Sequence, residues 1–139
     1  MIKRKKIMSF ICSICMVITL AVSSTMRASA VNYLSNYTTA SALKQTFSKD
    51  WEKSVLINTY YQGQKAYEGS MFVGFNTFLV DEDYAQYLWC PTGVWHYAKV
   101  VNSNGVSKST PAVKGGSDTG SAQIQHTGSN VKYYAYMGQ

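Results

Sequence analysis

From residue 53 to the end of the chain, apolar and polar side chains alternate in short runs separated by turn-forming residues. A period of two is typical of strands that bury one face, and closely spaced turns favour antiparallel neighbours. We therefore predict a mainly β fold, either an antiparallel β-sandwich or a small barrel. The runs that predict strands are 55–61, 71–79, 84–90, 94–101, 106–110, 122–126 and 131–137.

One segment ahead of these runs has a helical period instead. Leu43, Phe47 and Trp51 follow one another at intervals of four residues, which places them on one face of a helix. Thr38 or Thr39 provides a hydroxyl that can cap its first turn. The segment 39–50 is thus predicted to form a short N-terminal amphipathic helix.

The first 30 residues have the pattern of an export signal. Four positive charges in the first six residues precede an uncharged apolar run from Ile7 to Val22, and Ala28 and Ala30 form a small-x-small cleavage site. The run is shorter than the ~20 residues that a membrane-spanning helix needs. We predict a signal peptide at 1–30, cleaved after Ala30, and a secreted, extracellular domain at 31–139 that does not span the membrane.

Removing the signal peptide changes the charge. The whole chain has a formal charge of +6, but five of its 13 basic residues and none of its seven acidic residues lie in residues 1–30. Residues 31–139 therefore carry a net charge of +1, with eight scattered lysines and no arginine. A basic chain would favour a nucleic-acid partner, but a domain that is nearly neutral does not.

The cysteine content changes in the same way. Cys12 and Cys15 resemble a redox or metal-binding pair, but both lie in the export segment. Cys90 remains, so the secreted domain has no internal disulfide. We expect Cys90 to be buried, as free cysteines usually are. The alternatives are a dimer linked through Cys90 and a role as a nucleophile.

A nucleophilic site would combine the Cys90 thiol with His96 or His126 as the base and Asp118 as the orienting group. No cysteine-peptidase motif surrounds Cys90, and the residue lies at the end of a predicted strand, where no helix dipole lowers its pKa. We therefore do not expect an enzyme.

Metal binding has equally little support in the sequence. The two histidines lack a neighbouring carboxylate or thiolate at zinc-binding spacing. Asp81-Glu82-Asp83 lacks the periodic acidic loop of calcium sites, and a solvated turn that protects a strand edge is the simpler interpretation. We predict no metal and no cofactor.

The aromatic residues are the most informative functional feature. In the last predicted strand, alternation places Tyr134 and Tyr136 on one face and Tyr133 on the other. Because one face must be core, the other can carry an exposed aromatic strip, and such strips mark binding sites. The candidate ligand-binding residues are Trp95, Tyr97, Tyr134 and Tyr136.

About 45 residues at the end of the chain also carry a family resemblance. The residues concerned are His96-x-Ala98-x-Val100-Val101-Asn102-x-Asn104, then Ala122-x-Ile124 after a glycine-rich loop, and Tyr133-Tyr134-Ala135-Tyr136. In order and spacing they resemble the lactococcin-972-like bacteriocins. The resemblance implies a small secreted β-sandwich that acts on the envelope of growing Gram-positive bacteria by binding cell-wall precursor, without bond cleavage.

Together these features predict a secreted bacteriocin-like antibacterial protein. Its partner would be a cell-envelope component of Gram-positive bacteria, bound through the aromatic strip. The alternative is a non-lethal surface or matrix module that uses the same tyrosines to recognise a glycan or a host protein.

Overall fold

A computed structural model describes residues 30–116 and 118–139, and residues Val31–Gln139 form one compact unit. The predicted signal peptide, apart from Ala30, lies outside the described residues. The strands are β1 (Tyr33–Thr39), β2 (Trp51–Tyr61), β3 (Gln64–Asn76), β4 (Glu82–Trp89), β5 (Trp95–Val101), β6 (Ser107–Ser109), β7 (Val113–Lys114), β8 (Ser121–Gln125) and β9 (Lys132–Gly138).

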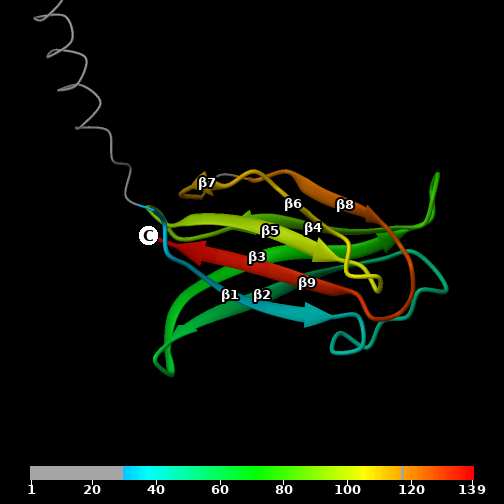
Figure 1. Cartoon of the computed structure of the whole chain (residues 1–139), viewed down its shortest axis with the longest axis horizontal. Helices are drawn as coiled ribbons and strands as arrows, with labels where there is room; N and C mark the ends of the chain where they lie inside the picture. Colours follow the sequence, from blue (N-terminus) through cyan, green and yellow to red (C-terminus); the bar gives the residue numbers. More distant parts are fainter. Residues whose placement is uncertain (1–29, 117) are drawn as a thin grey trace, which may run out of the picture. The chain divides into compact units, whose positions relative to one another are not determined.

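The strands form two antiparallel sheets (Figure 1). Sheet A has the order β1-β9-β5-β6, with β7 also paired to β5, and sheet B has the order β2-β3-β4-β8. Side chains from both sheets make a shared hydrophobic core. The predicted mainly β fold is confirmed, and the two facing sheets correspond to the sandwich form of it.

The period of two determines which side chains enter that core. In β9, Tyr133, Ala135 and Met137 are fully buried, whereas Tyr134 and Tyr136 are only half-buried. The same alternation runs through β5, whose core-facing side lies against β4 and β8 of sheet B. Each of these strands therefore presents one face to the core and the other outward.

Turn chemistry also agrees with the sequence. Gln62 and Gly63 join β2 to β3 with φ angles of 49° and 77°, the left-handed pair that a two-residue hairpin turn requires. Gly105, with a φ of 79°, lies in the turn between β5 and β6. Glycine has no β-carbon and therefore takes this conformation at little steric cost.

The helix predicted at 39–50 is not formed. Residues 40–44 make a single turn, in which the Ala42 N–H donates to Thr39 Oγ1 at 3.1 Å, and Lys44 leaves it with a φ of 57°. The apolar stripe is nevertheless used, because Leu43 and Phe47 pack against the core. The segment must cross from β1 in sheet A to β2 in sheet B, and this packing overrides its helical period.

No helix in the described part of the chain is long and apolar enough to cross a membrane.

Strand β1 is not predicted by the sequence. Its core-facing positions include Asn36 and Thr38, so it lacks the apolar alternation that identified the other strands. It forms by pairing along the whole of β9. The Asn36 side-chain amide then donates to the Asn58 carbonyl of β2 at 2.7 Å, which links sheet A to sheet B.

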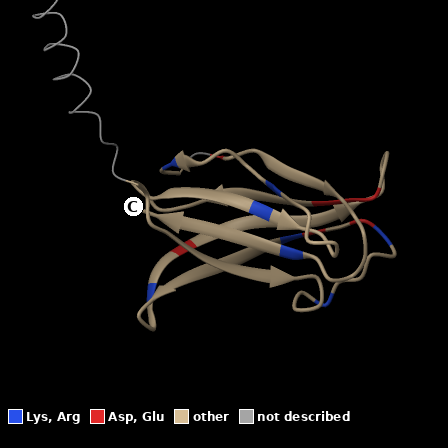
Figure 2. Cartoon of the chain, in the orientation of Figure 1, with Lys and Arg blue, Asp and Glu red and all other residues tan. Residues whose placement is uncertain are grey.

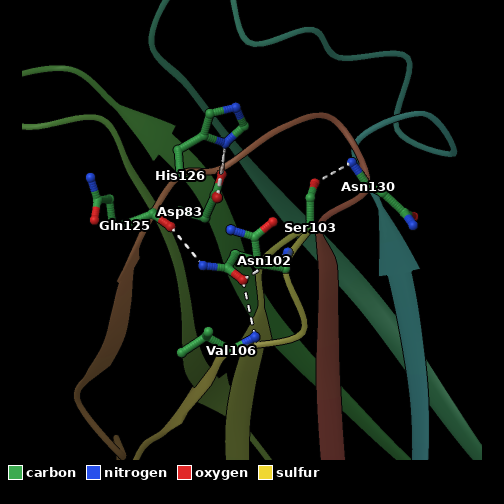
Figure 3. A network of polar contacts seen from close by, with 8 residues as sticks. Asp83, Asn102, Ser103, Val106, Gln125, His126 and Asn130 are labelled. Atoms are coloured by element: carbon green, nitrogen blue, oxygen red, sulfur yellow. Dashed lines mark hydrogen bonds and ion pairs between the residues drawn. The ribbon is translucent and has the colours of Figure 1, made fainter.

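A second polar link joins the sheets at the end of β5 (Figure 3). The buried Asn102 side chain donates from Nδ2 to the Gln125 carbonyl of β8 at 3.1 Å. Its Oδ1 accepts the backbone N–H groups of Asn104 and Val106, each at 3.1 Å. One amide thus closes the β5–β6 turn and holds that turn against sheet B.

Replacing Asn102 with Ala should lower the free energy of unfolding by about 2 kcal/mol, because two backbone donors and one carbonyl lose their partner. The measurement is urea denaturation of residues 31–139. Asn104→Ala is the control: its side chain is exposed and only its backbone takes part in the turn. Equal stability of the two variants would contradict this role for Asn102.

Candidate binding face

The four aromatic residues singled out from the sequence lie on the outer face of sheet A. Tyr97 of β5 is directly opposite Tyr136 of β9, and Tyr134 is opposite Lys99. Trp95 lies at the end of the same face, opposite Gly138 and Lys114. The structure therefore brings all four onto one surface, each partly accessible.

Two tyrosines of β1 extend this surface into a continuous series of ring contacts. Tyr33 meets Tyr97 edge-on at 5.0 Å between ring centroids, and Tyr97 stacks on Tyr136 at 4.4 Å with only 4° between the planes. Tyr136 is 6.0 Å from Tyr134, which is 5.2 Å from Tyr37. We call these five residues the tyrosine ladder.

Sequence reasoning missed the two tyrosines of β1. Tyr33 and Tyr37 share the outer face because they pair with Gly138 and Tyr134. The signal available in the sequence was the spacing of four residues between them, which is an even number and gives one face of a strand. It was not used because the strand itself was not predicted.

Gly138 lets the ladder reach across β9. It lies between Tyr33 and Trp95 in the register of the three strands. A β-carbon at this position would collide with the Asn32 carbonyl and crowd the backbone of Tyr33. A glycine here allows the start of β1 to approach closely enough for Tyr33 to contact Tyr97.

Two lysines lie over rings of the ladder. Lys99 Nζ is 5.9 Å from the centroid of Tyr134, and Lys132 Nζ is 5.3 Å from that of Tyr37. Partial burial, with Tyr136 and Tyr33 nearby, raises the pKa of Tyr97. The phenol of Tyr97 therefore stays protonated at neutral pH and can donate a hydrogen bond.

A hollow of about 390 Å³ lies beside the first residues of β1. Its lining contains no Lys, Arg, Asp, Glu or His side chain. The β1 residue in its lining is Leu34, which pairs with the core-facing Met137, so the hollow lies on the inner side of β1 and not on the face of the ladder. It offers an apolar recess and hydroxyl groups, without a general acid or base for catalysis near neutral pH.

Two members of the candidate nucleophilic site, His126 and Asp118, have partners other than Cys90. Cys90 is buried as expected, and burial raises the pKa of its thiol to about 11. His126 is paired with Asp83, and Asp118 accepts a hydrogen bond from Gln86 at 2.9 Å. His126 and Asp118 are thus bonded to residues other than Cys90, and the raised pKa of Cys90 disfavours its thiolate.

His96 is likewise part of the core. Its side chain is fully buried, and its ring meets that of Tyr87 edge-on at 4.9 Å between centroids. Its Nδ1 lies 3.3 Å from the Val94 carbonyl oxygen. These contacts place His96 between the sheets, away from the outer face that carries the ladder.

The acidic run at 81–83 is not simply a solvated turn, which corrects the interpretation from sequence. Asp81 is exposed, but Asp83 belongs to β4 and is fully buried, and its carboxylate lies 2.9 Å from His126 Nδ1. The His126 ring is held between Phe47 and Phe75, at 4.2 and 5.0 Å between centroids. Within residues 30–116 and 118–139, no cluster of three potential ligands could hold a metal ion.

The loop between β3 and β4 carries a second exposed apolar feature. Phe78 and Leu79 are 86% and 85% exposed. The base of the loop is fixed by Asp50, whose Oδ1 accepts hydrogen bonds from the Thr77 N–H at 3.0 Å and from its hydroxyl at 2.7 Å. The loop lies at the opposite end of the sandwich from the C-terminus (Figure 1) and is separate from the ladder.

The buried thiol leads to a prediction about reactivity. In folded residues 31–139, iodoacetamide should alkylate Cys90 at pH 7.5 at least about 100-fold more slowly than in 6 M urea, since the raised pKa leaves little thiolate and burial blocks access. Mass spectrometry measures the label. A Cys90→Ser variant controls for other sites. Rapid labelling, or a disulfide-linked dimer on a non-reducing gel, would contradict it.

The Asp83–His126 pair predicts a pH dependence of stability. Burial raises the pKa of Asp83 above 3.8, and His126 partly offsets this. The resulting stabilisation is present below pH 3.8 and is lost as the pH rises through the folded-state pKa. Asp83→Asn removes that loss while keeping an oxygen acceptor for His126. Relative to the wild type, the variant should therefore gain stability between pH 3 and pH 8 in urea denaturation; an unchanged difference would contradict this.

Comparison of the chain with protein-family models, with curated proteins and with solved structures finds no match. A function for this domain must therefore be argued from its own residues, their geometry on the outer face of sheet A, and the resemblance carried by its last strands.

Proposed function

We propose that this chain is a secreted, bacteriocin-like antibacterial protein that binds a cell-envelope component of Gram-positive bacteria through the tyrosine ladder. It acts by binding and cleaves no bond. The observation that carries this proposal is the ladder itself: five tyrosines from three adjacent strands in continuous ring contact on an outward face.

The physical properties of the ladder favour binding. Aromatic side chains combine a large apolar contact area with few rotatable bonds, and a tyrosine adds a hydroxyl that fixes orientation. Here the rings are already held by one another, so a ligand orders few side chains when it binds. A preorganised aromatic surface of this kind suits a ligand with sugar rings and hydroxyl groups.

Two further observations agree with an extracellular binding role. The first 30 residues have the pattern of a cleaved export signal. The resemblance to the lactococcin-972-like bacteriocins includes Tyr134 and Tyr136, which belong to the ladder.

The test is to add purified residues 31–139 to dividing and to non-growing Gram-positive cells, and to measure growth and binding to isolated envelopes. Binding together with inhibition of dividing cells alone is the expected result. Tyr134→Ala should weaken envelope binding roughly ten-fold, because it removes the ring that joins Tyr136 to Tyr37.

The matched control is Tyr60→Ala, since Tyr60 is an exposed tyrosine of β2 in sheet B and is outside the ladder. It should bind as the wild type does. Envelope binding without growth inhibition would favour the alternative, a non-lethal module that recognises a surface glycan or a host protein. No envelope binding by the folded domain would overturn the proposal.

A further inference from the structure

We infer that the ligand of the tyrosine ladder is an anionic polymer, one whose repeating units carry phosphate or carboxylate groups. This inference rests on the proposed function and specifies the chemistry of the ligand. Three observations support it: the distribution of charge between the two sheets, the position of the lysines on the ladder, and the hydroxyl groups that the ladder presents.

Sheet A carries charge of one sign only, whereas the strands of sheet B carry both signs, with Lys53 and Lys65 besides their acidic residues (Figure 2). The strands of sheet A contain four lysines, Lys99, Lys108, Lys114 and Lys132, and no acidic residue. All seven acidic residues belong to the strands of sheet B or to connecting loops. A domain with a net charge of only +1 therefore has one cationic sheet, and the ladder lies on that sheet.

Three of the four lysines share the face of the ladder. Lys99 pairs with Tyr134, Lys132 follows the same alternation in β9, and Lys114 pairs with Trp95. By contrast, Lys108 of the edge strand β6 pairs with the core-facing Val100 and therefore lies on the opposite face of sheet A from the ladder. None of the three forms a salt bridge with an acidic side chain in the described residues, so their charge is not neutralised by the protein.

The stacking of the rings adds to this preference. An aromatic ring is negative on its face and positive at its edge. The faces of Tyr97 and Tyr136 lie against each other, and the ammonium groups of Lys99 and Lys132 lie over Tyr134 and Tyr37. These contacts occupy part of the ring faces and hold ammonium groups beside the ladder, and the ammonium and hydroxyl groups attract anions.

The hydroxyl groups are free to donate. Side chains of a strand stand roughly perpendicular to the sheet, so a tyrosine holds its hydroxyl farthest from the backbone. No hydroxyl of the five ladder tyrosines makes a hydrogen bond within the described residues, whereas Tyr84 on sheet B donates to Glu52 at 2.7 Å. Five donors in a row, beside three ammonium groups, fit the oxygens of successive anionic units.

The experiment compares polymers of defined charge by calorimetry with residues 31–139. The probes are poly(glycerol phosphate), polygalacturonate and neutral dextran, with a single-stranded oligonucleotide of matched charge as the nucleic-acid arm. We expect binding to at least one of the first two and at least ten-fold weaker binding to dextran and to the oligonucleotide. Affinity should fall about ten-fold or more between 25 and 250 mM NaCl.

Charge variants locate the site. Lys99→Gln with Lys132→Gln should weaken binding of the anionic polymer about ten-fold or more, and Lys99→Arg with Lys132→Arg should restore most of it. Lys49→Gln with Lys53→Gln is the control of equal net charge; both of these lysines are exposed, just before and within β2. Circular dichroism confirms that every variant is folded.

The outcomes separate this inference from the proposed function. Binding to poly(glycerol phosphate) alone identifies phosphate as the recognised group, and binding to polygalacturonate alone identifies carboxylate. Dextran binding that equals polymer binding and does not depend on salt overturns the inference. Envelope binding by the Lys99→Gln, Lys132→Gln variant that equals wild-type binding and does not depend on salt also overturns it. Either result leaves the ladder as a neutral-glycan site. If the Lys49/Lys53 variant loses as much affinity as the Lys99/Lys132 variant, binding depends on net charge alone and the inference is overturned. Tightest binding to the oligonucleotide overturns it as well.

Discussion

The register of β9 between β1 and β5 is the constraint on which the rest of this structure depends. Because side chains alternate across a strand, a slip of one residue would bring Tyr134 and Tyr136 into the core and expose Tyr133. Burial of Tyr133, Ala135 and Met137 between the sheets prevents that slip. The same burial that stabilises the core therefore aligns the outward tyrosines of three strands.

Polar contacts add to the hydrophobic core in holding the strands together. Asn36 donates to a carbonyl of β2, and the buried Asn102 donates to a carbonyl of β8, so side-chain amides link the two sheets at separate places. Asp83 and His126 form a third buried polar contact, within sheet B, between β4 and the residue after β8. These contacts satisfy polar groups that would otherwise be costly to bury. None of them uses a side chain on the outer face of sheet A.

The two sheets therefore use their polar side chains differently. Sheet B carries acidic side chains that are used in the fold, such as Asp83 with His126 and Glu52 with Tyr84. The outer face of sheet A carries lysines and ladder tyrosines whose polar ends have no acidic partner in the described residues. Aligned hydroxyl donors and unneutralised ammonium groups on one face are the features on which the proposed recognition of an anionic ligand rests.

Local pattern in the sequence was sufficient for most of the architecture. Alternation and turn residues predicted most of the strands from 53 onward, but not the short β7, and they placed β3 at 71–79 instead of 64–76. They also placed Trp95, Tyr97, Tyr134 and Tyr136 on outward faces, because the period of a strand is a local property. Four features were decided by tertiary structure alone. Leu43 and Phe47 pack on the core without a helix, because their segment must cross between sheets. Strand β1, with polar core positions, exists only through its pairing with β9. The pairing of buried Asp83 with His126 and the continuity of the ladder both depend on which strands are neighbours. A local sequence pattern does not determine strand order.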